Sequence, residues 1–183
     1  MNVRLLAVLL CTFLQADDEA GKIMRPADKS AFRSGPVDVI ATAPEGILEI
    51  DGVRVKAEQP FPNVLQGSVD VKPGVHTLSL SWAGGRKEIK FHVGDEVPAG
   101  FASFRPHPPA AAPCTQCHQL SRRGRFVFKG GCFDCHNNSA FAKTHTHTPE
   151  VLSECGLCHN AHGSVASRHL TLTKELACKQ CHN

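Results

Sequence analysis

Tyrosine is absent from this chain of 183 residues, and the sequence has one tryptophan and two methionines. After the first residue, Met24 is the sole methionine. A metal site in this protein therefore has no tyrosine ligand and at most one thioether ligand. Long apolar runs are also scarce: Leu5–Leu14 is too short to cross a bilayer comfortably.

Residues 1–16 have the pattern of a secretory signal peptide. Arg4 gives a positive start, the apolar run follows, and Ala16 precedes an acidic stretch. This pattern predicts cleavage after Ala16 and export to the periplasm or the cell surface. The alternatives are an acylated Cys11 and an uncleaved anchor. Leu10 disfavours acylation because a small residue is expected before an acylated cysteine.

Composition divides the remaining chain into four segments. Residues 17–35 are polar and lack periodicity, so we expect a short flexible lead. Residues 36–95 contain short alternating runs between turn residues, which predicts a small all-β, sandwich-like domain. Residues 96–113 are rich in proline and alanine and are expected to be a linker. Residues 114–183 have little apolar periodicity, so we expect a mostly irregular domain with short helices.

Turn residues predict the hairpins of the β domain. Asp51-Gly52 separates two short strands and favours a type I′ turn, Pro73-Gly74 predicts a second hairpin, and Gly84-Gly85 predicts a third. Alternation then predicts which side chains face the core. From the last two runs these are Leu78, Leu80, Trp82, Ile89, Phe91 and Val93.

Four CxxCH motifs account for every cysteine after Cys11. CxxCH is the attachment signature of a c-type haem. The two thiols bind the vinyl groups along one porphyrin edge, and the next residue brings an imidazole to the iron. The thioether cysteines are Cys114, Cys117, Cys132, Cys135, Cys155, Cys158, Cys178 and Cys181, and the proximal histidines are His118, His136, His159 and His182.

Other uses of paired cysteines explain this pattern less well. Zinc takes CxxC pairs two at a time but does not require a histidine after each pair. A thioredoxin-like pair needs a βαβ setting, and iron–sulfur clusters use other spacings. Disulfides within each motif would close very short loops and add little stability. Four haems also explain the small apolar core, since each macrocycle is a large apolar body.

Charge is unevenly distributed along the chain. Residues 17–96 have ten basic and thirteen acidic side chains, a net −3, whereas residues 97–183 have nine and four, a net +5. Haem propionates would be the negative partners of the second half, and a solvated basic loop is the alternative. The basic side chains in question are Arg122, Arg123, Arg125 and Lys129.

The sixth iron ligand decides between an electron carrier and a catalyst. With no tyrosine and only a distant Met24, histidine is the main candidate, and lysine or no ligand are the alternatives. His76 and His92 fall in the β domain and are expected to be exposed strand residues. Five histidines remain for four irons: His107, His145, His147, His162 and His169.

Three of these histidines, His107, His147 and His162, lie in a recognisable context. Segment 147–182 resembles the doubled CxxCH motif of multihaem c-type cytochromes, in which HxP precedes the first site and CHxxHGS follows it. Segment 107–136 resembles a degenerate copy, which keeps the first histidine but has Ser121 where the second is expected. His145 or His169 would supply the missing ligand, or one iron is open.

The resemblance implies a tetrahaem cytochrome that transfers electrons through low-spin haems with two histidine ligands each. The expected partners are redox proteins and copies of the chain, but not nucleic acid. Ligation without methionine favours low potentials. The alternatives are a catalytic reductase subunit with one open iron, and a docking or filament cytochrome whose β domain binds a partner.

Overall fold

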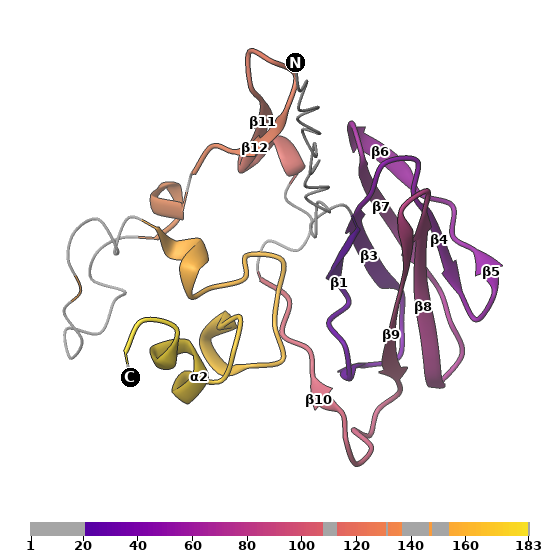
Figure 1. Ribbon diagram of the computed structural model, residues 1–183. Helices are drawn as coiled ribbons and strands as arrows, with labels where there is room; N and C mark the ends of the chain where they lie inside the picture. Colours follow the sequence, from indigo (N-terminus) through magenta and orange to yellow (C-terminus); the bar gives the residue numbers. More distant parts are fainter. Residues whose placement is uncertain (1–20, 108–112, 131, 137–146, 148–153, 183) are drawn as a thin grey trace, which may run out of the picture.

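The computed structural model describes residues 21–107, 113–130, 132–136, 147 and 154–182. Figure 1 shows a β-sandwich on one side and an irregular C-terminal part beside it. Strand β10 begins the stretch of chain that leads from one part to the other. The expected small β-sandwich-like domain is therefore confirmed.

The sandwich has a four-stranded and a six-stranded sheet. The first has the order β1-β3-β7-β6 and the second β10-β2-β9-β8-β4-β5. The strands of the first are β1 (Lys22–Arg25), β3 (Val37–Thr42), β6 (Glu58–Phe61) and β7 (Val64–Val69). Those of the second are β2 (Ser30–Phe32), β4 (Ile47–Ile50), β5 (Val53–Arg54), β8 (Gly74–Trp82), β9 (Gly85–Val93) and β10 (Ala102–Ser103).

Alternation along the strands creates one core between the sheets. In β3, residues alternate between buried and half-buried positions, as a strand with one face on a core should. Leu78, Leu80, Phe91 and Val93 are fully enclosed, and Ile89 is 8% exposed. Trp82 is partly buried and packs against the same cluster. The predicted inward faces of β8 and β9 are thus confirmed.

Two of the three predicted hairpins form. Ile50 pairs with Val53 across Asp51 and Gly52, whose φ angles of 51° and 80° are both positive, as a type I′ turn requires. Trp82 pairs with Gly85 at the end of the β8–β9 hairpin.

The second hairpin prediction was wrong. β7 pairs with β3 and β6, whereas β8 pairs with β4 and β9. The chain between β7 and β8 therefore crosses from one sheet to the other. Pro73-Gly74 marks a change of direction, but a turn residue does not specify which sheet receives the next strand.

Two predicted boundaries also need correction. Residues 17–35 were expected to be a flexible lead, but they contain β1 and β2, so the sandwich begins at Lys22. β2 pairs in parallel with β9 and β10, which places part of the expected 96–113 linker in the six-stranded sheet. Phe104 follows β10 and is only 9% exposed.

His76 fastens the Asp51 turn to the adjacent strand. Its Nδ1 lies 2.7 Å from Asp51 Oδ2, and its Nε2 lies 2.7 Å from the Lys72 carbonyl oxygen. Its side chain is 11% exposed, so the expectation of an exposed residue was wrong. Because both ring nitrogens have partners, His76 is not free to bind iron. The other strand histidine, His92, is half-buried.

This turn supports a prediction about pH. The Thr77 amide donates to Asp51 Oδ1 at 2.8 Å, and this bond and His76 hold the pKa of Asp51 below its usual value. The stabilisation is therefore present above the unfolded pKa and is lost as the pH falls through the folded pKa. Asp51→Asn should lower the free energy of unfolding by about 0.5–1 kcal/mol at pH 7, since the side chain is half exposed.

Urea unfolding of both proteins between pH 2 and pH 7 checks this expectation. The difference between wild type and Asp51→Asn should shrink below pH about 4, where the wild-type carboxylate becomes protonated. A difference that stays constant down to pH 2 would show that the charge of Asp51 plays no part.

The C-terminal part is mostly turns. Its elements are η1 (Cys114–Gln116), β11 (His118–Leu120), β12 (Phe126–Phe128), η2 (Cys132–Asp134), η4 (Cys155–Leu157), η5 (Ser167–His169) and α2 (Lys174–Lys179). Among the described residues that follow Phe104, no hydrophobic residue is buried. In the described ranges, no helix has the length and hydrophobicity needed to span a membrane.

Candidate haem-binding site

All four CxxCH motifs adopt the same local turn. In each motif the amide of the second cysteine donates to the carbonyl of the first, at 3.2 Å or 3.3 Å. In three motifs the histidine amide donates to that same carbonyl, at 2.9 Å for His136 and His159 and at 3.0 Å for His182. One compact turn therefore brings two thiols and an imidazole together, as attachment of one porphyrin edge requires.

The cysteines are thiols in this structure. Thiols of different motifs lie close together, because Cys132 is hydrogen-bonded to Cys155 and is near Cys117. Burial, followed by these two neighbours, raises the pKa of Cys132. The first CxxCH motif also contacts the sandwich, because the Cys114 thiol donates a hydrogen bond to Gln66 Oε1 at 3.2 Å.

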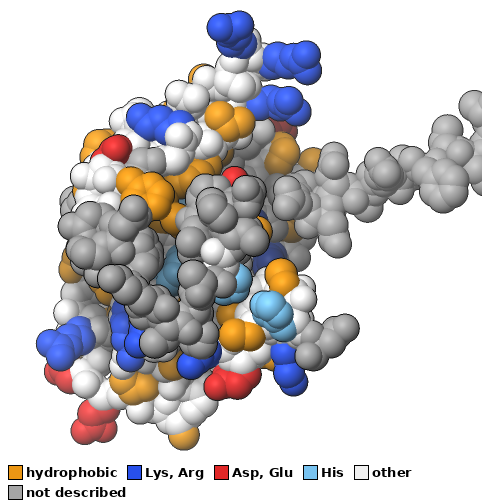
Figure 2. Space-filling model, turned by 90° about the vertical axis from the view of Figure 1, so that its left-hand side faces the viewer, with side chains coloured by type: hydrophobic (Ala, Val, Ile, Leu, Met, Phe, Trp, Pro, Cys, Tyr) orange, Lys and Arg blue, Asp and Glu red, His pale blue; other side chains and the backbone are white. Residues whose placement is uncertain are grey.

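Three motif histidines each lie opposite a histidine from elsewhere in the chain. The ring centroids are 6.0 Å apart for His118 and His162, 5.8 Å for His136 and His107, and 6.2 Å for His182 and His147. The first pair is stacked, with 16° between the ring planes. Figure 2 shows histidine side chains gathered near the middle of the face that this part presents.

These separations fit two imidazoles that bind one iron from opposite sides. With a metal–nitrogen bond of about 2 Å and about 1.1 Å from that nitrogen to the ring centre, the centroids would be about 6 Å apart. Each pair also joins one motif histidine to one of the five distal candidates. Three of the five candidates therefore lie beside a motif histidine, at a separation compatible with a shared iron.

Three of the six paired imidazoles are held in the neutral form that binds metals. Burial, with the nearby His118, Arg25 and Lys22 charges, lowers the pKa of His162 to about 4. Burial lowers the pKa of His118. Burial, followed by repulsion from His169 and His136, lowers the pKa of His107. At neutral pH their ring nitrogens can therefore act as ligands without first losing a proton.

A small loop holds His162 in place. The His162 amide donates to Asn160 Oδ1 at 2.9 Å, and the Ser164 hydroxyl donates to the Leu170 carbonyl at 2.6 Å. Arg105 and Ser164 exchange two backbone hydrogen bonds, of 2.9 Å and 3.0 Å. Residues 162–164 are thus hydrogen-bonded both within their own loop and to the segment that leaves the sandwich.

His159 differs from the other motif histidines. Its Nδ1 donates to the Arg168 carbonyl at 2.9 Å, which orients the ring and leaves Nε2 for a metal. Within the described ranges, no histidine ring is paired with His159 as the other three pairs are. His169 lies against His107, with ring centroids 5.5 Å apart and planes at 76°. The remaining candidate, His145, lies outside the described residues.

Ser121, which replaces the expected second histidine of the degenerate copy, has a role in the β11–β12 turn. Its hydroxyl accepts a hydrogen bond from the Arg125 amide at 3.1 Å, and its own amide donates to the Arg125 carbonyl at 2.8 Å. The basic residues of this hairpin are exposed, and Lys and Arg side chains stand out at the top of Figure 2. Their pairing with propionates stays a prediction.

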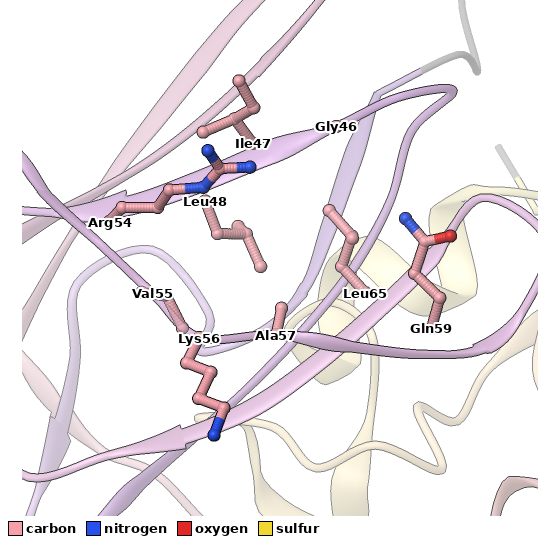
Figure 3. A pocket seen from close by; sticks show the side chains of 9 residues that line it. All are labelled: Gly46, Ile47, Leu48, Arg54, Val55, Lys56, Ala57, Gln59 and Leu65. Atoms are coloured by element: carbon pink, nitrogen blue, oxygen red, sulfur yellow. The ribbon is translucent and has the colours of Figure 1, made fainter.

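The sandwich has a pocket of its own. Its volume is about 440 Å³, and Leu48, Val55 and Leu65 line it together with Arg54 and Lys56 (Figure 3). Sequence reasoning gave no signal for this pocket. It is lined by β4 and β5 of the six-stranded sheet and by β6 and β7 of the four-stranded sheet, whereas β10 lies at the opposite edge of the six-stranded sheet.

The histidine pairs are two-residue sites. Among the described residues, no group of three or more His, Cys, Asp or Glu side chains could hold a metal ion. A haem iron takes only two ligands from the protein, since the porphyrin provides the other four.

Comparison with known proteins adds little to this geometry. No family model matches the chain, and no curated protein matches it. An FMN-binding β-glucuronidase from Facaelibacterium prausnitzii L2-6 is similar over 47% of this chain and 13% of its own, with 18% identity and a TM-score of 0.36. A polysaccharide lyase is similar over 42% and 12%, with 12% identity and a TM-score of 0.33. The chain thus spans about an eighth of each of these proteins.

Proposed function

We propose that this protein is an exported c-type cytochrome that carries electrons through four covalently bound haems. The observation that carries the proposal is the set of three imidazole pairs at 5.8–6.2 Å, each made of one CxxCH histidine and one distal candidate. Two strong protein ligands leave an iron no position for substrate, so such a site passes electrons and does not bind a substrate at the metal.

The chain's own residues have distinct roles in this proposal. The eight motif cysteines would hold the macrocycles, and His118, His136, His159 and His182 would be the proximal ligands. His162, His107 and His147 would be distal ligands of the first, second and fourth haems. The apolar surface of the haems would act as the core of a part in which, among the described residues, no hydrophobic side chain is buried.

The first experiment is to produce the chain in a host that attaches c-type haem and to count haems and spin states. We expect four haems per chain that remain attached after denaturation, with mainly low-spin EPR signals. A double variant, Cys178→Ser with Cys181→Ser, should retain three haems. If the wild type holds no covalent haem, or if all its irons are high-spin, the proposal fails.

His159 provides the observation that favours the alternatives, because the described residues supply no imidazole partner for it. An open third iron would suit a reductase subunit, whereas a ligand from a second copy would suit a filament or docking cytochrome. Titration with CO separates these cases. Binding at one haem in four at every protein concentration supports an open iron, and binding that is lost as the protein associates supports a shared ligand. No CO binding supports a ligand from the same chain.

A further inference from the structure

Arg25 is a buried cation at the end of β1. The residue is 8% exposed, and its Nη2 atom is 3.1 Å from Asp38 Oδ2. Its guanidinium lies 5.2 Å from the centre of the Phe104 ring. Its Nε atom is buried without a hydrogen-bond partner. Asp38 and Phe104 offset the cost of burying this charge, but the Nε atom stays without a partner.

The geometry connects Arg25 to the His162 ligand. Phe104, which lies under the guanidinium, packs directly on Gly163, where an added Cβ would be 2.5 Å from the ring. Gly163 directly follows His162. The next residue of each segment, Arg105 after Phe104 and Ser164 after Gly163, takes part in the two backbone hydrogen bonds that join the segments. A single aromatic ring thus lies between the cation and the loop that carries the ligand.

We propose that Arg25 tunes the haem held by His118 and His162, raising its reduction potential above the value that the two histidines alone would give. The inference rests on the proposed function, and it gives a residue of the sandwich a role in setting a haem potential. Reduction adds one negative charge to the iron centre, so a fixed positive charge nearby stabilises the reduced form. The effect is larger in a buried site than in water because the dielectric screening is weaker there.

Asp38 opposes this effect, so replacing Asp38 gives a second test of it. Its carboxylate has the opposite charge and contacts the guanidinium, but its side chain is 39% exposed against 10% for Arg25. Solvent therefore screens Asp38 more than Arg25, which leaves a net positive influence on the haem. Removing either charge should shift the potential of the same haem, in opposite directions.

The test measures the potentials of all four haems in the intact protein by spectroelectrochemical titration. Arg25→Gln should make the equilibrium constant for reduction of one haem about tenfold smaller, which is about 59 mV for a one-electron couple. Asp38→Asn should shift the same haem to a higher potential. Arg25→Lys, which keeps the charge, should restore most of the wild-type value. Arg54→Gln on the edge strand β5 is the matched control and should shift nothing.

The outcomes separate this inference from the proposed function. Haem content and spin state show whether the protein is a tetrahaem cytochrome, independently of any potential. If four low-spin haems are present but Arg25→Gln and Asp38→Asn leave all potentials unchanged, or shift them in the same direction, the tuning role is overturned. If Arg25→Gln does not fold, Arg25→Lys and Asp38→Asn still decide it, because an unchanged potential in Asp38→Asn contradicts the inference.

Discussion

In the proposed tetrahaem protein, replacing His162 with alanine is expected to convert one haem from a low-spin, six-coordinate iron to a high-spin, five-coordinate iron. His162 lies 6.0 Å from His118 between ring centroids, and the two planes are 16° from parallel. No other histidine among the described residues has this stacked arrangement with His118. Because burial keeps the His162 imidazole neutral, the loss of its nitrogen should have the same effect across the neutral pH range.

EPR spectra and CO titration measure this change. We expect a new high-spin signal from one haem in four and CO binding at that haem alone. His162→Met offers a second readout, since a methionine ligand should keep the haem low-spin while raising its potential. His76→Ala is the control: both of its ring nitrogens are already bonded within the sandwich, so haem spectra should not change. If His162→Ala still has only low-spin irons, the pairing with His118 is incorrect.

Local patterns in the sequence predicted much of the sandwich. Strict alternation in β8 and β9 identified the buried face correctly, because the side-chain period of a strand is two. β1 and β2 were missed because strands of four and three residues are too short to show a period. The crossing between β7 and β8 was missed for a different reason. Sheet membership depends on contacts between distant strands, which a single turn does not encode.

The same division applies to the haem site. The cysteines and the proximal histidine lie within five consecutive residues, so turn geometry places them together wherever the motif occurs. A distal ligand comes from another segment, and its partner depends on how the loops cross. His162 follows the third motif but faces His118 of the first. Sequence reasoning therefore named candidate ligands, whereas the structure shows which histidine rings lie near one another and that Phe104 lies between Arg25 and Gly163.

Replacing Gly163 with alanine is expected to separate the His162 loop from the sandwich. The φ angle of Gly163 is +107°, which side-chain-bearing residues rarely adopt. A Cβ atom there would lie 2.5 Å from Phe104 Cζ and 2.8 Å from the Arg105 carbonyl oxygen. Backbone strain and overpacking of this kind each cost about 1–3 kcal/mol, so Gly163→Ala should lower the free energy of unfolding by about 2–4 kcal/mol.

The loss should extend beyond stability, because the same loop carries His162, the proposed distal ligand of the first haem. If the backbone bonds between Arg105 and Ser164 break, His162 should no longer be held opposite His118, and the first haem should become partly high-spin. Thermal unfolding monitored by circular dichroism, combined with EPR, measures both effects. Gly100→Ala is the matched control, since the φ angle of Gly100 is also positive, at +84°, but nothing lies within 4 Å of the added Cβ there. Equal stability of the two variants would contradict the close packing of Phe104 on Gly163. A destabilised Gly163→Ala protein with four low-spin haems would show that the loop holds its ligand without the sandwich.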